Sequence, residues 1–244
     1  MRLNQFLAKA GLGSRRSVEE LIRAGRIKVG SGPGLLTTSI DPASDAVTLD
    51  GRPLRLPADF TYVLLHKPPG YTVTRRDPRA RATVYEVLPV AFRKLAYVGR
   101  LDRESEGALL FTDDGVLAHR LLRPEYGVER EYAVETDGPI PPQAAESLLA
   151  GIPIAEGHLA AARRVAVKSA SARHSVLEVV LCEGKKREVR QMCRAVGIPV
   201  KRLVRTRFGP VCLDRLAVGE ARELSAREVA LLRKTAAAAK KTLP

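Results

Sequence analysis

The stretch Gly99-Arg100-Leu101-Asp102-Arg103-Glu104-Ser105-Glu106-Gly107-Ala108-Leu109-Leu110-Phe111-Thr112 decides the fold, because a glycine-punctuated turn runs directly into an apolar strand. Within this turn Asp102 has an arginine on either side, Arg100 and Arg103. Guanidinium groups beside a carboxylate favour its ionised form, and the turn presents the carboxylate at the end of a rigid strand. The pattern favours a nucleophile or an anionic stabiliser; a surface turn whose acid only pairs with arginines is the alternative.

Charge is the most informative property of the chain as a whole. Of its 244 residues, 41 are Lys or Arg and 27 are Asp or Glu, which gives a formal net charge of +14 at pH 7. Such an excess attracts polyanions, so nucleic acid is the leading candidate partner. A membrane surface is the weaker candidate, because no apolar run approaches the roughly 20 residues that span a bilayer.

The cysteines, the histidines and the start of the chain bear on location and metal binding. The first residues lack the features of a secretory signal, so we expect a cytoplasmic protein, acting as a monomer. The absence of C-x-x-C spacing argues against a disulfide framework or a thiolate site at Cys182, Cys193 and Cys212. A histidine metal site would require distant convergence of His66, His119, His158 and His174, and we expect no metal.

The N-terminal segment has the pattern of a small basic module. Apolar residues recur with helical spacing at 3, 6, 7 and 10 and again at 18, 21 and 22, which predicts two short helices, the second with Ser14 as a candidate cap and Gly25 as its end. A strand over 26–29 follows, and its alternation places Arg26 and Lys28 on one face. With Arg15 and Arg16 on the second helix, these residues predict a phosphate-facing surface.

This segment, with its run KAGLGSRRSVEELIRAGRIKV, resembles the αL-type RNA-binding module shared by a small-subunit ribosomal protein and many RNA-modifying enzymes. The resemblance covers residues 1 to about 55, and a generic basic helical hairpin is the alternative interpretation. A proline-containing linker over 56–60 then separates two domains. We predict an RNA-binding domain over 1–57, a catalytic domain over 60–235 and a flexible tail over 236–244.

The second domain is predicted to be α+β, built on a mixed β-sheet. Buried or alternating patterns predict strands at 62–67, 109–112, 131–136 and 175–182. Helical patterns follow Asp114 and lie around 143–149, over 187–196 and from Ser225 onward, where Ser225 and Glu228 form a capping box. Between Cys182 and Arg207 there are nine basic residues against two acidic ones, and the density predicts contact with phosphate. On its helix, Arg187, Arg190 and Arg194 would share one face.

Four motifs in order, HKPPGYTVTRRDP, YVGRLDRESEGALLFTDDG, EREYAVE and EGKKREVRQM, resemble those of the RsuA/RluB family of pseudouridine synthases. The resemblance covers nearly the whole chain. It implies a mixed-sheet catalytic domain with a cleft, a uridine in structured ribosomal RNA as substrate, and no cofactor.

The resemblance also implies roles for individual residues. Asp102 matches the catalytic aspartate, Arg100 the residue that takes the place of the extruded base, Tyr132 the tyrosine that stacks on uracil, and Lys185 the basic partner of the aspartate. Departures from the family pattern are Glu188, Ala108 and Asp113, of which Glu188 could compete with Asp102 for Lys185.

The chemistry of uridine isomerisation agrees with these roles. The carboxylate of Asp102 could attack the sugar, attack the base or remove a sugar proton, and the residues do not discriminate between these routes. A glycoside hydrolase would need a second carboxyl group, but Glu104 and Glu106 are expected to face solvent or to pair with Arg100 and Arg103. A non-catalytic RNA-binding or ribosome-assembly factor is the remaining alternative. Contacts with RNA are predicted for Arg15, Arg16, Arg26, Lys28, Arg100, Arg187 and Arg190.

Overall fold

The computed structural model describes residues 1–13, 15–42, 44–56, 59–79 and 81–237. The chain forms two compact units, one comprising Met1–Thr61 with Asp113–Gly115 and the other Tyr62–Thr112 with the residues from Val116 onward. Among the described helices, none has both the length and the apolar character needed to cross a bilayer. The predicted tail over 236–244 falls mostly outside the described residues, although its first two residues, Ala236 and Ala237, still belong to the last helix.

The first unit is built from two helices and a small antiparallel sheet. Helices α1 (Leu3–Lys9) and α2 (Arg15–Arg23) accompany strands in the order β2-β1-β3-β4, with bounds β1 Ile27–Val29, β2 Gly32–Pro33, β3 Val47–Leu49 and β4 Arg52–Leu54. The predicted helical stripes are confirmed, because Leu3, Phe6, Leu7, Val18 and Ile22 are all buried. The predicted cap Ser14 lies outside the described residues. Asp50 and Gly51, both with positive φ, form the tight turn between β3 and β4.

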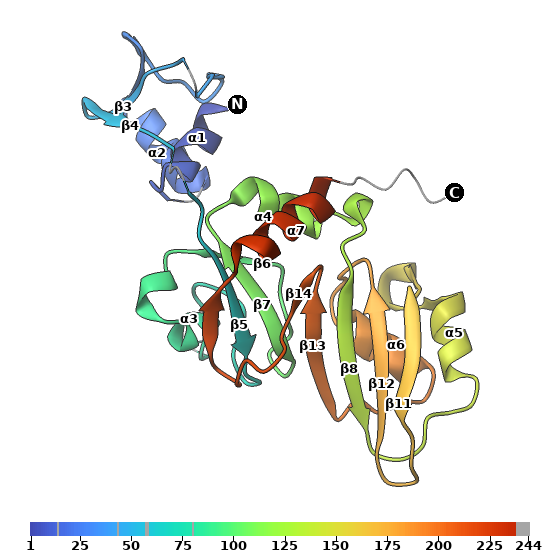
Figure 1. Cartoon of the computed structure of the whole chain (residues 1–244). Helices are drawn as coiled ribbons and strands as arrows, with labels where there is room; N and C mark the ends of the chain where they lie inside the picture. Colours follow the sequence, from blue (N-terminus) through green and yellow to red (C-terminus); the bar gives the residue numbers. More distant parts are fainter. Residues whose placement is uncertain (14, 43, 57–58, 80, 238–244) are drawn as a thin grey trace. The chain divides into compact units, whose positions relative to one another are not determined.

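A single nine-stranded sheet forms the second unit (Figure 1). Its main path runs β11-β12-β8-β13-β7-β5-β15, with β14 paired to β13 and β6 paired to β7. The bounds are β5 Tyr62–Lys67, β6 Ala96–Val98, β7 Glu106–Thr112, β8 Arg130–Thr136, β11 Arg164–Ser169, β12 Ser175–Leu181, β13 Arg202–Phe208, β14 Val211–Cys212 and β15 Ala221–Glu223. A separate two-stranded ladder joins β9 (Ile152–Pro153) to β10 (Leu159–Ala160).

The sheet is mixed because β7 and β13 run parallel at its centre, whereas the other strand pairs of the described sheet are antiparallel. Gly107 of β7 lies opposite Arg205 of β13 at this junction. Its φ is +114°, and an added Cβ would lie 2.3 Å from the Arg205 carbonyl oxygen. Only glycine therefore permits the strands to approach here, directly after the loop that carries Asp102.

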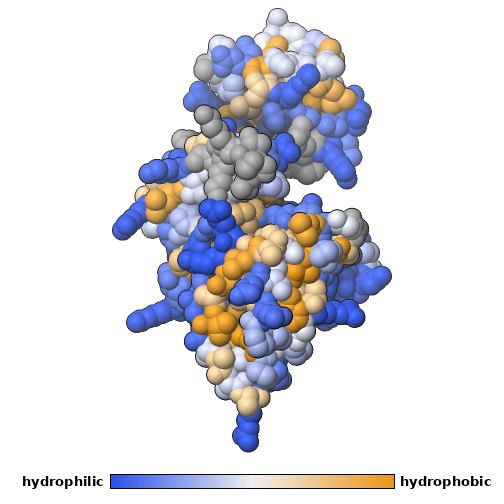
Figure 2. Space-filling view, turned by 90° about the vertical axis from the view of Figure 1, so that its right-hand side faces the viewer, coloured by the Kyte–Doolittle hydropathy of each residue, from blue (hydrophilic) through white to orange (hydrophobic). Residues whose placement is uncertain are grey.

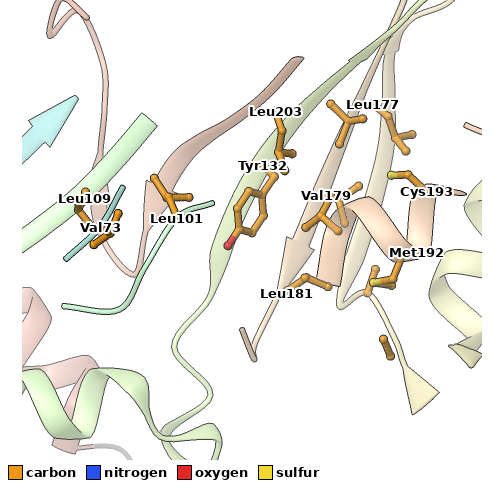
Figure 3. Close-up of a cluster of buried hydrophobic side chains, with 14 of the residues drawn as sticks. Val73, Leu101, Leu109, Tyr132, Leu177, Val179, Leu181, Met192, Cys193 and Leu203 are labelled. Atoms are coloured by element: carbon orange, nitrogen blue, oxygen red, sulfur yellow. The ribbon is translucent and has the colours of Figure 1, made fainter. Parts of the chain in front are cut away.

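Helices complete the core of this unit. Their bounds are α3 Val84–Val87, α4 Gly115–Leu122, α5 Ala144–Ala150, α6 Glu188–Ala195 and α7 Ala226–Ala237, with short 3-10 turns at Val90–Phe92, Pro124–Tyr126 and Ala155–Gly157. The buried face of α6 packs Met192 and Cys193 against Leu177 and Val179 of β12 (Figure 3). The predicted capping box of α7 is confirmed, because the Ser225 amide donates to Glu228 at 2.8 Å and the Glu228 amide donates to the Ser225 hydroxyl at 3.3 Å.

The side of this unit that carries α5 and β11 exposes a mixture of apolar and charged surface (Figure 2). The exposed apolar side chains there include Leu149, Leu159 and Val167. Charged residues of β11 pair across the sheet, since Arg164 reaches Glu131 at 3.0 Å and Lys168 reaches Glu178 at 2.8 Å. These neutralised pairs make this side a poor surface for a polyanion.

Candidate active site

A cleft of about 980 Å³ lies in the second unit. Its walls come from the loop between β6 and β7, the segment after β5, strands β8 and β13, and the residues that lead into α6. Basic residues outnumber acidic ones along these walls; the basic ones are Arg76, Arg81, Arg100, Arg103, Arg130, Lys185, Lys186, Arg187 and Arg205. Because a groove lined mainly by one sign of charge concentrates opposite charge, the cleft is suited to a phosphate-bearing ligand.

Asp102 lines this cleft from the loop that enters β7. Its side chain is 26% exposed, so a ligand in the cleft can reach the carboxylate. The loop is closed by the Ser105 amide, which donates to the Asp102 carbonyl at 3.1 Å. One oxygen of Asp102 lies 4.0 Å from Nε of Arg190, whose side chain is only 14% exposed. This loose ion pair holds positive charge behind the carboxylate and leaves the carboxylate face toward the cleft open.

Arg190 comes from the first turn of α6 and is itself poorly solvated. Burial and the neighbouring Arg187 lower its pKa, whereas the charges of Asp102 and Glu104 raise it. Its Nε atom has no hydrogen-bond partner among the described residues, and its NH2 group is 3.5 Å from the Ser105 hydroxyl. A buried cation with an unmade hydrogen bond gains from an anion nearby, and Asp102 supplies that anion.

Lys67 binds the backbone of the loop that carries Asp102. It is fully buried at the end of β5, and its Nζ donates to the carbonyl oxygens of Pro68, Arg103 and Ser105 at 2.8, 3.2 and 2.7 Å. Burial lowers its pKa to about 8, while the charges of Glu104 and Asp102 oppose that shift. Two of its three acceptors belong to the loop, so Lys67 fixes the loop backbone on both sides of Glu104.

A reciprocal clamp fixes the same loop to the Pro-Pro-Gly turn. The Gly70 amide donates to the Arg103 carbonyl at 2.7 Å, and Nε of Arg103 donates to the Gly70 carbonyl at 2.9 Å. From the sequence, Arg103 was predicted to lie beside the Asp102 carboxylate and to favour its ionised form. In the structure its guanidinium holds backbone instead, and together with Lys67 it makes the position of Asp102 rigid.

Arg205 is the buried cation at the centre of the sheet. Its Nε donates to the Ala108 carbonyl at 2.7 Å and its NH1 to the Arg100 carbonyl at 3.4 Å. Its guanidinium also lies 5.1 Å from the ring centroid of Phe208. The remaining nitrogen, NH2, has no partner among the described residues, and Arg205 lines the cleft. Arg205 therefore keeps one buried donor unpaired in the wall of the cleft, beside the loop that carries Asp102.

Tyr132 forms an apolar wall of the cleft from β8. Tyr132 is buried, and its register partner on β13 is Arg205. Leu203 of the same strand belongs to the same buried cluster as Tyr132. Figure 3 shows its ring between Leu101 on one side and the residues of β12 and α6 on the other. A flat aromatic surface in a polar cleft is a suitable place for a planar ring of a ligand.

The pairing of Asp102 with Lys185 stays a prediction, and the structure adds a second basic residue, Arg190, beside the carboxylate. Lys185 lines the same cleft, but among the described residues the ion pair of Asp102 is with Arg190. The reason is geometric: α6 begins at Glu188, so Arg190 projects from a helix packed beneath the loop, whereas Lys185 precedes the helix. Glu188 does not compete for the Lys185 ammonium either, because its carboxylate accepts the Lys185 backbone amide at 2.8 Å.

The expectation for the two glutamates after Asp102 was wrong in part. Glu104 is exposed and pairs with Arg187 at 3.2 Å. Glu106 is buried, receiving hydrogen bonds from Arg202 at 2.7 and 3.0 Å, with Nε2 of His66 3.0 Å from one of its oxygens. Because these contacts occupy Glu106 within the sheet, it is not available as the second carboxyl group of a glycoside hydrolase.

The basic residues predicted to contact RNA have different surroundings. Arg16, Lys28, Arg100 and Arg187 are exposed. The side chain of Arg15 lies outside the described part of the structure, and Arg26 is paired with Asp50, which lowers the pKa of that carboxyl group. Arg190 sits behind Asp102 instead of at the surface. The predicted phosphate surface over 185–207 shrinks further, because ion pairs inside the sheet or at its edge hold Lys201, Arg202 and Arg207.

Sequence reasoning missed the roles of Lys67, Arg190 and Arg205. A signal existed for Arg205: the run Arg202-Leu203-Val204-Arg205-Thr206-Arg207-Phe208 contains enough β-branched and aromatic residues to predict a strand. No local pattern distinguishes a lysine that binds three carbonyl groups from one that faces solvent.

Comparison with known proteins adds independent findings. The family described as RNA pseudouridylate synthase matches residues 61–195, and the S4 domain matches residues 1–31. Ribosomal large subunit pseudouridine synthase B of Pseudomonas aeruginosa is 37% identical, over 95% of this chain but 61% of its own length, so this chain spans less than two thirds of that relative. An uncharacterized RNA pseudouridine synthase of Aquifex aeolicus is 36% identical, over 95% of this chain and 93% of its own.

The fold matches a solved structure as well. A protein described as a pseudouridylate synthase superposes with a TM-score of 0.67 at 26% identity, over 95% of this chain and 99% of that one. The match covers both the small basic unit and the mixed sheet, so the order of the two units along the chain is shared.

Proposed function

Since this chain belongs to the RNA pseudouridylate synthase family and carries an S4 domain, we propose that it isomerises a specific uridine of ribosomal RNA to pseudouridine, with Asp102 acting on the nucleotide. The observation that supports this most directly is the position of Asp102. Its carboxylate lies 4.0 Å from Arg190 in a basic cleft that Tyr132 also lines. The names of the relatives make large-subunit ribosomal RNA the first substrate to test.

The reaction requires few chemical groups. The bond between N1 of uracil and C1′ of ribose breaks, the base turns, and C5 bonds to C1′ while the C5 hydrogen leaves as a proton. An ionised carboxylate that attacks the sugar or the base, or that removes a sugar proton, is enough to start it. Asp102 supplies this group on each route, with the Arg190 guanidinium 4.0 Å from one of its oxygens. The residues of the chain perform this chemistry without a cofactor.

The cleft must also retain the free base while it turns. A uridine in structured RNA is stacked or paired, so it has to be extruded at a cost of a few kcal/mol. Stacking of uracil on Tyr132 offsets part of that cost. We infer that Arg100 occupies the space that the base leaves, which its exposure and its position on the cleft lining support. The unpartnered NH2 of Arg205 can hydrogen-bond a carbonyl oxygen of the base or a phosphate.

Release of the C5 hydrogen gives a direct test of the proposed function. Ribosomal RNA transcribed with uridine tritiated at C5 and incubated with the purified chain should release tritium to water, and carbodiimide-stop primer extension should map one new pseudouridine. Protein-free RNA and a partly assembled ribosomal subunit should be compared, because either could present the uridine in reactive form. RNA binding without tritium release from either substrate would support an assembly factor and contradict the proposal.

The first unit is expected to contribute binding and not chemistry. Changing Arg15 and Arg16 together to Ala should make the dependence of log K on log salt shallower by about 1.4 to 1.8, because two phosphate contacts are lost. The measurement is RNA affinity by filter binding or fluorescence anisotropy over a range of salt concentrations. The matched control changes two exposed arginines that do not line the cleft, Arg173 and Arg227, to Ala. An equal change of the salt slope in both double variants would contradict the proposal that the first unit binds RNA through Arg15 and Arg16.

A further inference from the structure

A cluster of possible metal ligands lies behind one wall of the cleft. It consists of His158, Glu183 and Glu188, each offering one ligand atom, and these atoms all lie within 4.8 Å of one another. The three residues come from separate elements: His158 precedes β10, Glu183 follows β12, and Glu188 opens α6. From the sequence no metal was predicted, because the four histidines do not have the close spacing of metal ligands. The fold brings one of them, His158, close to two carboxylates that are distant in the sequence.

Glu188 contributes to the cluster a buried carboxylate with one unpaired oxygen. The residue is only 4% exposed. One of its oxygens accepts the Lys185 amide at 2.8 Å, but the other, Oε1, has no hydrogen-bond partner among the described residues. A buried carboxylate with an unmet oxygen next to a second carboxylate is costly unless a proton or a cation joins it.

The donor set decides which cation would fit. Nε2 of His158 lies 2.9 Å from Oε1 of Glu183, and both side chains are half-buried. One imidazole nitrogen with two carboxylate oxygens is a set that Zn²⁺ binds readily, whereas Mg²⁺ and Ca²⁺ prefer oxygen ligands alone. We propose that His158, Glu183 and Glu188 form a binding site for a divalent transition-metal ion of the zinc class. The ion would lie between Nε2 of His158 and the two carboxylates, and the neutral imidazole would carry its single proton on Nδ1.

The ion would act on structure and not on the reaction. It would join β10, the end of β12 and the start of α6, and so hold the segment over 184–188, which forms one wall of the cleft. Of the three ligands only Glu188 lines that cleft, and the ion pair of Asp102 among the described residues is with Arg190 and not with any of the three. Bound metal is therefore expected to raise stability and to leave the chemical step unchanged.

The test uses untagged protein of full length, freed of metal with EDTA and titrated with Zn²⁺ by calorimetry. We expect one saturable site, and a rise in the melting temperature of about 5–10 °C at a hundredfold excess over Kd. His158→Gln and Glu188→Gln should each weaken Zn²⁺ binding at least tenfold, whereas the exposed His174→Gln should not. Glu188→Gln nearly preserves shape, and circular dichroism of each metal-free variant checks that it is folded.

Two results would overturn the proposal. One is the absence of saturable binding, or binding that His158→Gln and Glu188→Gln leave unchanged. The other is a thiolate charge-transfer band when Co²⁺ replaces Zn²⁺, because it would assign the ion to Cys182, which precedes Glu183, and not to the carboxylates. Loss of Zn²⁺ binding in the variants with normal tritium release would support the site independently of the proposed function.

Discussion

Replacing Asp102 by Asn should abolish isomerisation while RNA binding stays within about twofold. An amide has nearly the shape of a carboxylate but neither its charge nor its basicity, so it can neither attack nor remove a proton. Loss of a group of this kind lowers the rate by about 10⁴-fold or more. The measurement is tritium release from C5-labelled ribosomal RNA under single-turnover conditions, which reports the chemical step without product release.

The matched control for this variant is Asp137→Asn. Asp137 is also an aspartate paired with one basic residue, Lys201 at 2.9 Å, but it is exposed and does not line the cleft. This control should retain full activity, so a general effect of losing a negative charge can be separated from the effect at Asp102. A rate for Asp102→Asn within about tenfold of the unaltered protein would show that another group performs the reaction.

Replacing Arg190 by Met should lower the rate of the chemical step by about 10²- to 10³-fold, a size typical of a lost electrostatic contact in an active site. Methionine keeps much of the side-chain volume and removes the guanidinium that lies 4.0 Å from Asp102. RNA affinity should change little, because Arg190 is mostly buried and does not line the cleft. The melting temperature of the variant should be measured together with the rate, because the substitution also removes the contact between Arg190 and Ser105.

Lys185→Met is the comparison that distinguishes the two basic residues. Lys185 is exposed in the cleft, and its ammonium forms no ion pair with Asp102 among the described residues. We expect a loss of less than about tenfold in rate and a salt dependence of binding shallower by about 0.7 to 0.9, as for one phosphate contact. A large rate loss for Lys185→Met with little loss for Arg190→Met would support the pairing of Asp102 with Lys185 that the family resemblance implied.

Local signals in the sequence were sufficient for much of the fold. The helical stripe of α1, the capping box of α7 and the long apolar strands β5 and β7 each depend on residues close together in the chain, and each lies where it was predicted. The mixed sheet was predicted correctly as a class. Its order was not, because the parallel pairing of β7 with β13 depends on contacts between distant segments.

The site shows the same division more sharply. Asp102 was identifiable because its turn, its flanking arginines and its motif are all local. The basic residues around Asp102 were less predictable, because a basic segment offers several candidate partners and the packing of α6 brings Arg190 to the carboxylate. The buried positions of Lys67 and Arg205 were not predictable from charge, since both residue types usually face water; their acceptors are backbone carbonyl groups that the fold brings together.

The central pairing of β7 with β13 also determines when a newly translated chain becomes competent. Val204 pairs with Glu106, so the strand that completes the site is synthesised long after the loop that carries Asp102. Such late, non-local pairing makes final assembly slow relative to that of the earlier strands. A nascent chain that has passed Asp102 but not Phe208 lacks β13, so the loop that carries Asp102 is without the buried Arg205 beside it until that late strand has been made.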